Sequence, residues 1–441
     1  MSDTHGNGAG QGAAERRGLA LHTKIFIGLA AGATAGVTCH QLLGGSRFLE
    51  IVQSYLTDPL GKIFLNLLIM VVVPLVFASL VLGVAQIGDV RKLGRIGLRT
   101  IGYFLVVTAL AVCIGLALVN TVRPGDRLPA ETRERLLATY GREAGALRSA
   151  AGQTTFGIQT LVNIVPRNPI EAVARPSPDM LALVFVSLIV GVALTLVRRE
   201  QAQPIVALLE SVNAVTVKII DLAMRLAPYG VTALIFSVTS RFGYHLLVAL
   251  GAYVATVLAG LALHLFGSFS LLVWALARLD PLAFFRRSQA IMLTAFSTSS
   301  SNATLPTTIA VSQERLGIPR NICGFVLPLG ATMNMNGTAL FEGVTVLFLA
   351  QVFGVQLSLG AQVVVVIMSV LTAVGAAGVP SGSLPLLIII LQMLKIPAEG
   401  IAIILGVDRL LDMCRTVLNV LGDVTCAAYV ARAEGVELPR R

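Results

Sequence analysis

The chain has 441 residues, of which 55% are hydrophobic and 13% are charged, and its mean hydropathy is +0.82. Because a soluble globular protein carries roughly 25% charged residues, this composition excludes a soluble domain and predicts a polytopic membrane protein. The net charge is +10, but the basic residues cluster at the ends of apolar segments and form no basic domain interleaved with aromatic residues. We therefore expect no nucleic-acid partner.

The N-terminal residues 1–18 are polar and rich in glycine and lack an apolar core, which predicts a disordered tail and not a signal peptide. Six apolar segments follow, and each is a candidate membrane span, since a transmembrane helix needs about 20 apolar residues. They are residues 22–43, 59–87, 96–122, 180–197, 205–240 and 244–277.

Basic residues flank these segments in alternate loops. They gather at residues 16–24, 91–99, 198–199 and 278–287. The positive-inside rule assigns such loops to the cytoplasm, so both termini are expected there. The longest connection, residues 123–179, is expected on the outside.

Beyond residue 280, small polar residues interrupt two apolar stretches, at 297–306 and at 375–383. In the second stretch the flanking pieces, 363–374 and 384–394, are each about 17 Å long as helices, which is too short for a hydrocarbon core of about 30 Å. The pattern predicts two re-entrant helical hairpins, over residues 281–315 and 359–395. Glycine and serine kinks in ordinary spans are the alternative interpretation.

The apolar span between these stretches, residues 322–353, is itself interrupted by polar residues. Asn334 and Thr338 lie one helical turn apart, as do Thr338 and Glu342, so amide, hydroxyl and carboxyl groups share a face. Unwinding near residues 334–337 would free carbonyl oxygens, which together with the asparagine side chains are hard ligands for an alkali cation.

The last apolar stretch, residues 401–431, carries an ionic face. Five of its polar residues fall within a sector of about 80° on a helix that turns roughly 100° per residue; they are Asp408, Asp412, Arg415, Asn419 and Asp423. Each charge at the bilayer centre costs roughly 2.5 to 3.5 kcal/mol, so this face must look onto protein or an aqueous cavity. The pattern indicates a binding site for a charged ligand.

Four motifs in this order resemble the dicarboxylate/amino acid:cation symporters, the family of the glutamate transporters. They are SSSNATLP at 299–306, LPLGATMNMNGT at 327–338, GAAGVP at 375–380 and DRLLDMCRTVLNVLGD at 408–423. The resemblance implies an all-α fold with eight transmembrane helices, two re-entrant hairpins and inverted repeats. It also implies a homotrimer in the lipid bilayer, in which a mobile transport domain slides like an elevator against a static scaffold.

The resemblance divides the chain into domains. The scaffold comprises residues 19–95, with the first two helices, and residues 123–240, with the extracellular loop and the fourth and fifth helices. The transport domain comprises residues 96–122, the third helix, and residues 241–432, which hold the sixth helix, both hairpins and the last two helices. Residues 433–441 form a cytoplasmic tail.

The resemblance also assigns ligand roles. Arg415 binds the side-chain carboxylate of an acidic substrate, and Asp412 binds its ammonium group. Further substrate contacts come from Thr338, Thr416, Asn419, Ser299, Ser301, Val379 and Ser383. One sodium site is formed by Gly330, Asn334, Asn419 and Asp423, and a second by Thr332 with the carbonyls of Ala373, Val374 and Ala376. A structural ion pair of Arg415 with Asp408 or Asp412 is the alternative role for this arginine.

The chain departs from the family pattern at a third, deeper sodium site. Asn336 replaces a carboxylate, Phe104 and Val107 replace oxygen-bearing ligands, and only Thr108 keeps a hydroxyl there. We therefore expect this site to be absent. Glu342 falls where the mammalian glutamate transporters place a proton-carrying glutamate, so it is the candidate proton carrier; a permanently protonated or arginine-paired structural glutamate is the alternative.

The leading functional hypothesis is a secondary active symporter for L-aspartate or L-glutamate, driven by Na⁺, H⁺ or both, in a bacterial inner membrane. A C4-dicarboxylate symporter is the first alternative, and Asp412 argues against it because a succinate-like substrate has no ammonium group. A substrate-gated anion conductance is the second. We expect no catalytic residues, because no histidine lies near the serine run 299–301 in the sequence and no nucleophile elbow surrounds it.

Overall fold

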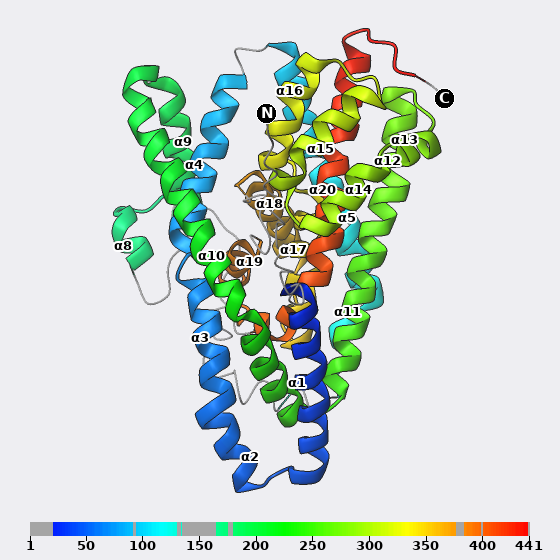
Figure 1. The fold of residues 1–441 in the computed structure, drawn as a ribbon. Helices are drawn as coiled ribbons and strands as arrows, with labels where there is room; N and C mark the ends of the chain where they lie inside the picture. Colours follow the sequence, from blue (N-terminus) through cyan, green and yellow to red (C-terminus); the bar gives the residue numbers. More distant parts are fainter. Residues whose placement is uncertain are drawn as a thin grey trace, which may run out of the picture.

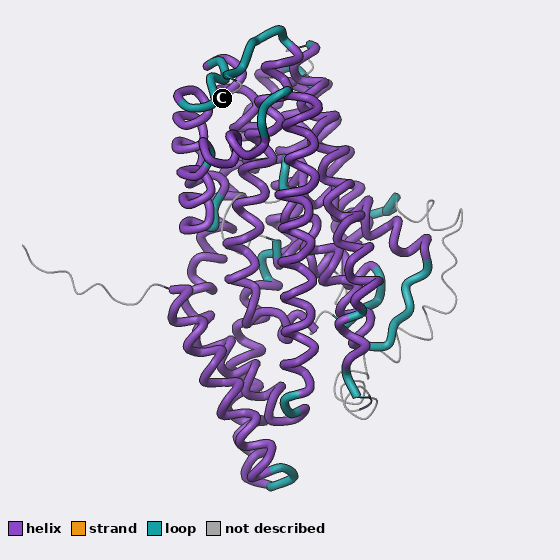
Figure 2. The backbone as a smooth tube through the Cα atoms, turned by 90° about the vertical axis from the view of Figure 1, so that its right-hand side faces the viewer, coloured by secondary structure: helices purple, strands orange, loops and turns teal. Residues whose placement is uncertain are grey.

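The computed structural model describes residues 21–90, 94–129, 134, 165–174, 180–375, 383–397 and 400–439. All regular structure among these residues is helical, as Figure 2 shows. This confirms the predicted all-α class. The predicted N-terminal tail, most of the connection 123–179 and the tip of the second interrupted stretch lie outside the described residues.

The helices of residues 21–90 and 180–242 form one group and pack on one another. They are α1 (Leu21–Leu43), α2 (Arg47–Val52), the π-turn η1 (Gln53–Thr57), α3 (Asp58–Ile69), α4 (Val72–Val90), α9 (Met180–Leu196) and α10 (Arg199–Phe242). Helix α10 contacts α1, α3 and α4, and α4 contacts α9 (Figure 1). With 44 residues α10 exceeds the predicted segment 205–240, because Pro204 and Pro228 are both accommodated inside it.

The remaining helices form the rest of the bundle. They are α5 (Arg95–Val122), η3 (Pro124–Arg127), α8 (Pro169–Ala174), α11 (His245–Ala262), η4 (Leu263–Ser268), α12 (Phe269–Leu272), η5 (Val273–Ala277), α13 (Pro281–Arg287), α14 (Gln289–Thr298), α15 (Ser301–Glu314), α16 (Arg320–Met333), α17 (Asn336–Val352), α18 (Leu359–Gly375), α19 (Leu384–Met393) and α20 (Ile401–Ala433). Helix α20 contacts α5, α11, α14, α15, α16 and α17, so it lies at the centre of this group (Figure 1).

The structure contains both interruptions that the sequence predicts on the N-terminal side of α17. Between α14 and α15, Ser299 adopts a left-handed conformation with φ of 50°, and the Ser300 hydroxyl accepts a hydrogen bond from the Ala303 N–H, which caps α15. Between α16 and α17 the helix is broken only at Asn334 and Met335. The predicted unwinding of residues 334–337 was therefore too long by two residues.

Helix α18 begins four residues before the predicted start at residue 363. The reason is a local cap, since the Ser358 hydroxyl accepts a hydrogen bond from the Ala361 N–H at 3.2 Å. With 17 residues α18 is about 25 Å long as an α-helix, which is longer than the length of about 17 Å expected for residues 363–374. Helix α19, with 10 residues, starts and ends close to its predicted bounds.

Five helical stretches of the described chain are long and apolar enough to cross a membrane. They are Thr23–Leu43, Arg47–Ala85, Arg95–Arg127, His245–Ala277 and Arg320–Val352. Shorter apolar helices occupy Ala182–Leu196, Leu359–Val374 and Leu384–Met393. Several spans with shorter apolar helices between them agree with the predicted polytopic membrane protein.

Small residues allow α1 and α10 to approach closely. Gly28, Gly32 and Gly36 recur every fourth residue and are buried. A Cβ atom at Gly32 would lie 2.6 Å from the Thr232 carbonyl oxygen, and one at Gly36 would lie 2.9 Å from the Phe236 carbonyl oxygen. Such a stripe lets two helix backbones meet without an intervening side chain, which is how many membrane helices associate.

Replacement of Gly32 by leucine is expected to force α1 away from α10. Overpacking of a buried contact costs about 1 to 3 kcal/mol, so the thermal unfolding temperature of the purified protein in detergent should fall. Thermal-shift chromatography measures this, and Gly251→Leu is the control because no atom lies within 4 Å of a Cβ there. Equal melting temperatures for both variants would contradict the proposed close contact.

Candidate functional site

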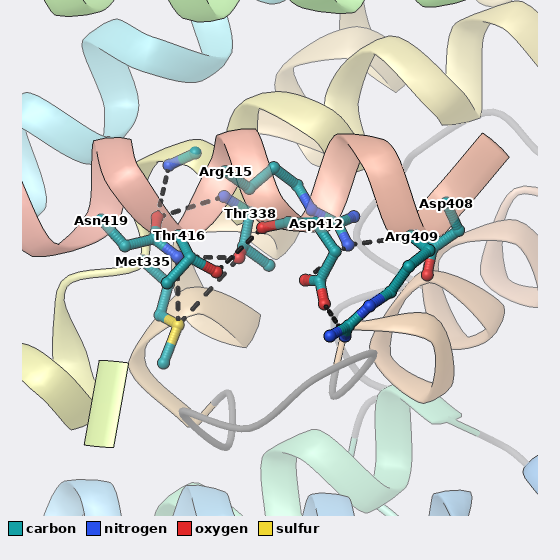
Figure 3. Close-up of polar contacts among 9 residues, drawn as sticks. Met335, Thr338, Asp408, Arg409, Asp412, Arg415, Thr416 and Asn419 are labelled. Carbon is teal, nitrogen blue, oxygen red and sulfur yellow. Dashed lines mark hydrogen bonds and ion pairs between the residues drawn. The ribbon is translucent and has the colours of Figure 1, made fainter. Parts of the chain in front are cut away.

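Arg415 of α20 is the centre of the candidate site (Figure 3). Its side chain is 0% exposed. Nη2 donates to Asp412 Oδ1 at 2.9 Å and to Asp408 Oδ1 at 3.0 Å, so the predicted ion pairs on this face exist. The guanidinium carbon lies 3.8 Å from the centroid of the Phe341 ring, which adds a cation–π contact.

The guanidinium group keeps unused hydrogen-bonding capacity. Its Nε and Nη1 atoms have no partner within the described part of the chain, although both are buried. A buried donor without an acceptor is costly. A planar guanidinium presents parallel N–H pairs at Nε with Nη2 and at Nη1 with Nη2, so a two-point contact with a carboxylate uses one free nitrogen together with Nη2. The arrangement therefore suits a carboxylate ligand that takes the place of an aspartate on Nη2.

Asp412 lies between two arginines. It accepts the bond from Arg415, and Oδ2 lies 3.5 Å from Nη1 of Arg409, a pairing that the sequence analysis did not anticipate. The Thr416 hydroxyl donates to the Asp412 carbonyl oxygen at 2.8 Å, which turns the hydroxyl back onto its own helix. Together with Asp408, the group contains two positive and two negative side chains, so it is neutral in sum when all four are charged.

Asn419 joins α20 to the start of α17. Its Oδ1 accepts a hydrogen bond from the Gly337 N–H at 2.7 Å, and its Nδ2 donates to Thr338 Oγ1 at 3.2 Å and contacts Met335 Sδ at 3.5 Å (Figure 3). An amide oxygen on a free N–H of the first turn stabilises the beginning of α17. A Cβ atom at Gly337 would lie 2.7 Å from the Arg415 carbonyl oxygen, so glycine is required for this approach.

Asp423 is a buried carboxylate that has no cationic side chain within 4 Å among the described residues. It is 2% exposed, and its partner is the neutral amide of Asn334, whose Nδ2 donates to Oδ1 at 2.8 Å. Gly330 packs directly on it, since a Cβ there would lie 3.0 Å from the Asp423 Cβ. An uncompensated buried charge is expensive, so Gly330, Asn334 and Asp423 offer a place for a cation, with Asn419 one turn away on α20.

Some of the residues expected to form the second cation site lie within the described part of the chain. Ala373 and Val374 lie in the last turn of α18, where carbonyl oxygens lack partners within the helix. Thr332 lies on α16, which contacts α18, and its hydroxyl donates to the Leu329 carbonyl oxygen at 2.9 Å. Ala376 and Val379, assigned to the cation and substrate sites, lie outside the described residues.

At the residues expected to mark an altered third site, Thr108 and Asn336 form a neutral hydrogen-bonded pair. Thr108 Oγ1 donates to Asn336 Oδ1 at 2.6 Å, so the amide oxygen is already engaged. Phe104 and Val107 are buried and contribute no oxygen from their side chains. The amide nitrogen of Asn336 has no partner in the described regions, and it would repel a cation rather than bind it.

Glu342 of α17 is 0% exposed. Its Oε2 accepts a hydrogen bond from Thr372 Oγ1 of α18 at 2.7 Å, while Oε1 has no partner among the residues that the structure describes. No arginine or lysine of those residues lies within 4 Å of this carboxyl group, which argues against the arginine-paired structural role. Sequence reasoning missed Thr372, because nothing in the α18 sequence distinguishes it until the fold places it beside Glu342.

The serine residues assigned to the pocket lie at helix ends. Ser299 precedes α15, Ser301 is its first residue, and Ser383 precedes α19. The hydroxyls of Ser299 and Ser383 are buried and have no partner in the described chain. Both α14 and α15 contact α20, so the first break faces the helix that carries Arg415.

Known proteins resemble this chain over most of its length. A model of the sodium:dicarboxylate symporter family matches residues 21–433. The chain is 34% identical to the proton/sodium-glutamate symport protein of Bacillus subtilis (strain 168) over 423 residues, which cover 96% of this chain and 94% of the relative. It is 34% identical to the proton/glutamate-aspartate symporter of Escherichia coli (strain K12), with 86% and 85% covered. It is 33% identical to a C4-dicarboxylate transport protein of Bacillus subtilis (strain 168), with 85% and 87% covered.

The replacement Asp423→Asn is expected to reduce stabilisation of the purified protein by sodium, because it removes the carboxylate of the first of the two expected cation sites. A cation bound only to the folded state at about 100 times its Kd stabilises by about 2.7 kcal/mol, and the neutral amide removes the charge that would attract it. Melting temperature against sodium concentration, with choline as the replacement ion, measures the effect. The exposed Asp221→Asn is the control. An unchanged sodium response in Asp423→Asn would exclude this residue as a ligand.

Proposed function

Because this chain belongs to the sodium:dicarboxylate symporter family, we propose that it is a secondary active symporter for an acidic amino acid, L-glutamate or L-aspartate. Import is coupled to Na⁺, to H⁺ or to both. The observation that carries the proposal is the buried Arg415, whose Nη2 donates to Asp412 while its Nε and Nη1 have no partner among the described residues. A cationic and an anionic side chain that lie side by side match a substrate that carries both a carboxylate and an ammonium group.

In this proposal Arg415 binds the side-chain carboxylate of the substrate through a two-point contact. Asp412 exchanges its bond with Arg415 for the substrate ammonium group. The site stays close to neutral in both states, because the added carboxylate replaces Asp412 on the guanidinium. Thr338, Thr416 and Asn419 supply further polar contacts, and Ser299, Ser301, Val379 and Ser383 close the pocket.

Sodium binding favours the same closed state as the substrate. The first site uses Gly330, Asn334, Asn419 and Asp423, and the second uses Thr332, Ala373, Val374 and Ala376. Support for the first comes from the buried, uncompensated charge of Asp423. Asn419 takes part in both the substrate and the first sodium site, so binding of one ligand orders groups that the other needs, which is a positive coupling free energy.

Glu342 is the proposed proton carrier. Burial disfavours the charged form of a carboxyl group unless a partner compensates it, and the Thr372 hydroxyl is a single, neutral partner. The third sodium site is absent in this proposal, since Thr108 and Asn336 satisfy each other and Phe104 and Val107 offer no ligand. A proton at Glu342 therefore takes over part of the coupling.

The proposed architecture follows the family. It has eight transmembrane helices, two re-entrant hairpins at 281–315 and 359–395, and inverted repeats. The scaffold is 19–95 and 123–240, the transport domain is 96–122 and 241–432, and both termini are cytoplasmic. Three copies assemble in a bacterial inner membrane, and the transport domain moves as an elevator. The helix break at residues 299–300, between α14 and α15, which contact each other, supports the first hairpin.

A C4-dicarboxylate symporter is the second candidate, favoured by the relative of that name. Arg415 would serve either substrate, because both carry a carboxylate. Asp412 separates them, since only an amino acid offers it an ammonium group. The two candidates therefore predict different effects of one substitution.

Asp412→Asn is expected to weaken the binding of L-aspartate about 10- to 100-fold, because a hydrogen bond to a charged group contributes about 1.5 to 3 kcal/mol. The binding of succinate, which has no ammonium group, should weaken far less. Competition against labelled L-aspartate in proteoliposomes measures both, with Asp221→Asn as the exposed control. If wild-type protein prefers succinate, and Asp412→Asn leaves that preference intact, the dicarboxylate candidate is correct.

Glu342→Gln is expected to abolish net uptake driven by a proton gradient, because glutamine mimics the neutral acid and cannot release a proton. Exchange of internal for labelled external substrate should continue and should no longer depend on pH. Parallel net-uptake and exchange assays across pH measure this, with the exposed Glu314→Gln as the control. Full pH dependence of uptake in Glu342→Gln would exclude Glu342 as the carrier.

A further inference from the structure

The Thr372 hydroxyl has more acceptors than protons. Its Oγ1 lies 2.7 Å from Glu342 Oε2, 2.8 Å from the Met368 carbonyl oxygen and 3.2 Å from the Ser369 carbonyl oxygen. A hydroxyl group has one proton to donate and can accept as well. Only one of these three contacts is therefore a bond donated by Thr372 at any moment.

This geometry provides two complete arrangements of hydrogen bonds. When Glu342 is ionised, Thr372 donates to its carboxylate. When Glu342 is protonated, the carboxylic acid donates to Thr372 Oγ1, and the hydroxyl proton turns to the Met368 carbonyl oxygen. Both arrangements use the same heavy-atom positions, so the change requires only rotation about one C–O bond and gain or loss of one proton by Glu342.

We propose that Thr372 is a positioning residue that lets the buried Glu342 carboxyl group change its protonation state, by reversing the direction of the hydrogen bond between them. The proposal rests on the proton coupling proposed above, and it names the group that allows Glu342 to gain and lose a proton in a buried site. Glu342 lies on α17 and Thr372 on α18, the first arm of the proposed second hairpin. The bond therefore joins the proposed proton carrier to the proposed second hairpin.

The other charged and titratable groups on elements that pack against α17 do not replace Thr372. On α20, Arg415 acts on Glu342 through its charge, and its ion pairs are with Asp408 and Asp412. On α11, Tyr253 bonds Thr345 at 2.8 Å. Helices α18 and α19 carry no charged residue.

The charged and titratable side chains of α5 and η3 bond other residues or are exposed. Arg95 and Arg99 pair with Glu434, and Tyr103 bonds Thr425 at 2.7 Å. Cys113 and Arg127 are exposed, and Asp126 pairs with Arg123. Among the described residues, Thr372 is thus the hydrogen-bond partner of the Glu342 carboxyl group.

The test compares variants of the reconstituted full chain that differ by one hydroxyl. Thr372→Val keeps the shape and removes the hydroxyl, Thr372→Ser keeps the hydroxyl, and Thr372→Ala is the second deletion should valine impair folding. Ser369→Ala is the matched control, because it removes a buried hydroxyl of α18 that has no hydrogen-bond partner among the described residues. Infrared difference titration records the carbonyl band of the neutral carboxyl group, assigned by its loss in Glu342→Gln.

In Thr372→Val the ionised carboxylate loses its donor, so the band should persist to higher pH, with a midpoint about one pH unit more alkaline. The band should also move to higher frequency, because the neutral acid no longer donates to a hydroxyl. Thr372→Ser and Ser369→Ala should match the wild type. A midpoint in Thr372→Val and Thr372→Ala that equals the wild-type value overturns the proposal.

The pH profile of uptake separates this proposal from the proposed function. We expect the half-maximal pH of uptake to shift in Thr372→Val in the same direction as the infrared midpoint. An infrared shift together with uptake that stays pH-dependent in Glu342→Gln would uphold the Thr372 contact and overturn proton coupling at Glu342. Loss of pH dependence in Glu342→Gln with no change in either readout for Thr372→Val would uphold proton coupling and overturn the role of Thr372.

Discussion

The ion pairs of Arg415 inside the helix bundle are the constraint on which the rest of the site depends. A fully buried guanidinium is tolerable only with acidic partners, and Asp412 and Asp408 supply them, about one and two turns away on the same helix. These pairs fix the guanidinium against the Phe341 ring. They also leave two of its nitrogens unpartnered in the described structure, and we propose that this unused hydrogen-bonding capacity serves to bind the substrate carboxylate.

The helix breaks bring backbone groups to the same region. Side chains of an apolar bundle provide few polar atoms, but a helix that ends inside it exposes free N–H or carbonyl groups. The break at residues 334–335 places Asn334 beside Asp423 and the first N–H groups of α17 beside Asn419. The end of α18 adds carbonyls and brings Thr372 to Glu342. In our proposal the substrate, sodium and proton sites therefore lie on neighbouring helices, which favours their coupling.

The sequence predicted those parts of the fold and site that depend on local pattern. Helical periodicity placed Arg415, Asp412 and Asp423 on one face, and interruptions of apolar segments located the breaks near residues 299 and 334. The family motifs then gave roles that periodicity could not. What escaped prediction depends on tertiary contact or local capping: the Thr372–Glu342 bond, the Arg409–Asp412 pair, and the start of α18 at its Ser358 cap. Periodicity defines a face of a helix but not the partner that covers it.

Gradient-driven uptake by the wild-type protein would show whether this chain is a coupled symporter. Purified protein in sealed proteoliposomes would receive labelled L-aspartate or L-glutamate with an inward sodium gradient, an inward proton gradient, both or neither. We expect accumulation above the external concentration whenever a coupling gradient is present, and collapse of that accumulation when ionophores dissipate it. Equilibration without accumulation under every gradient, or accumulation of succinate without either amino acid, would contradict it.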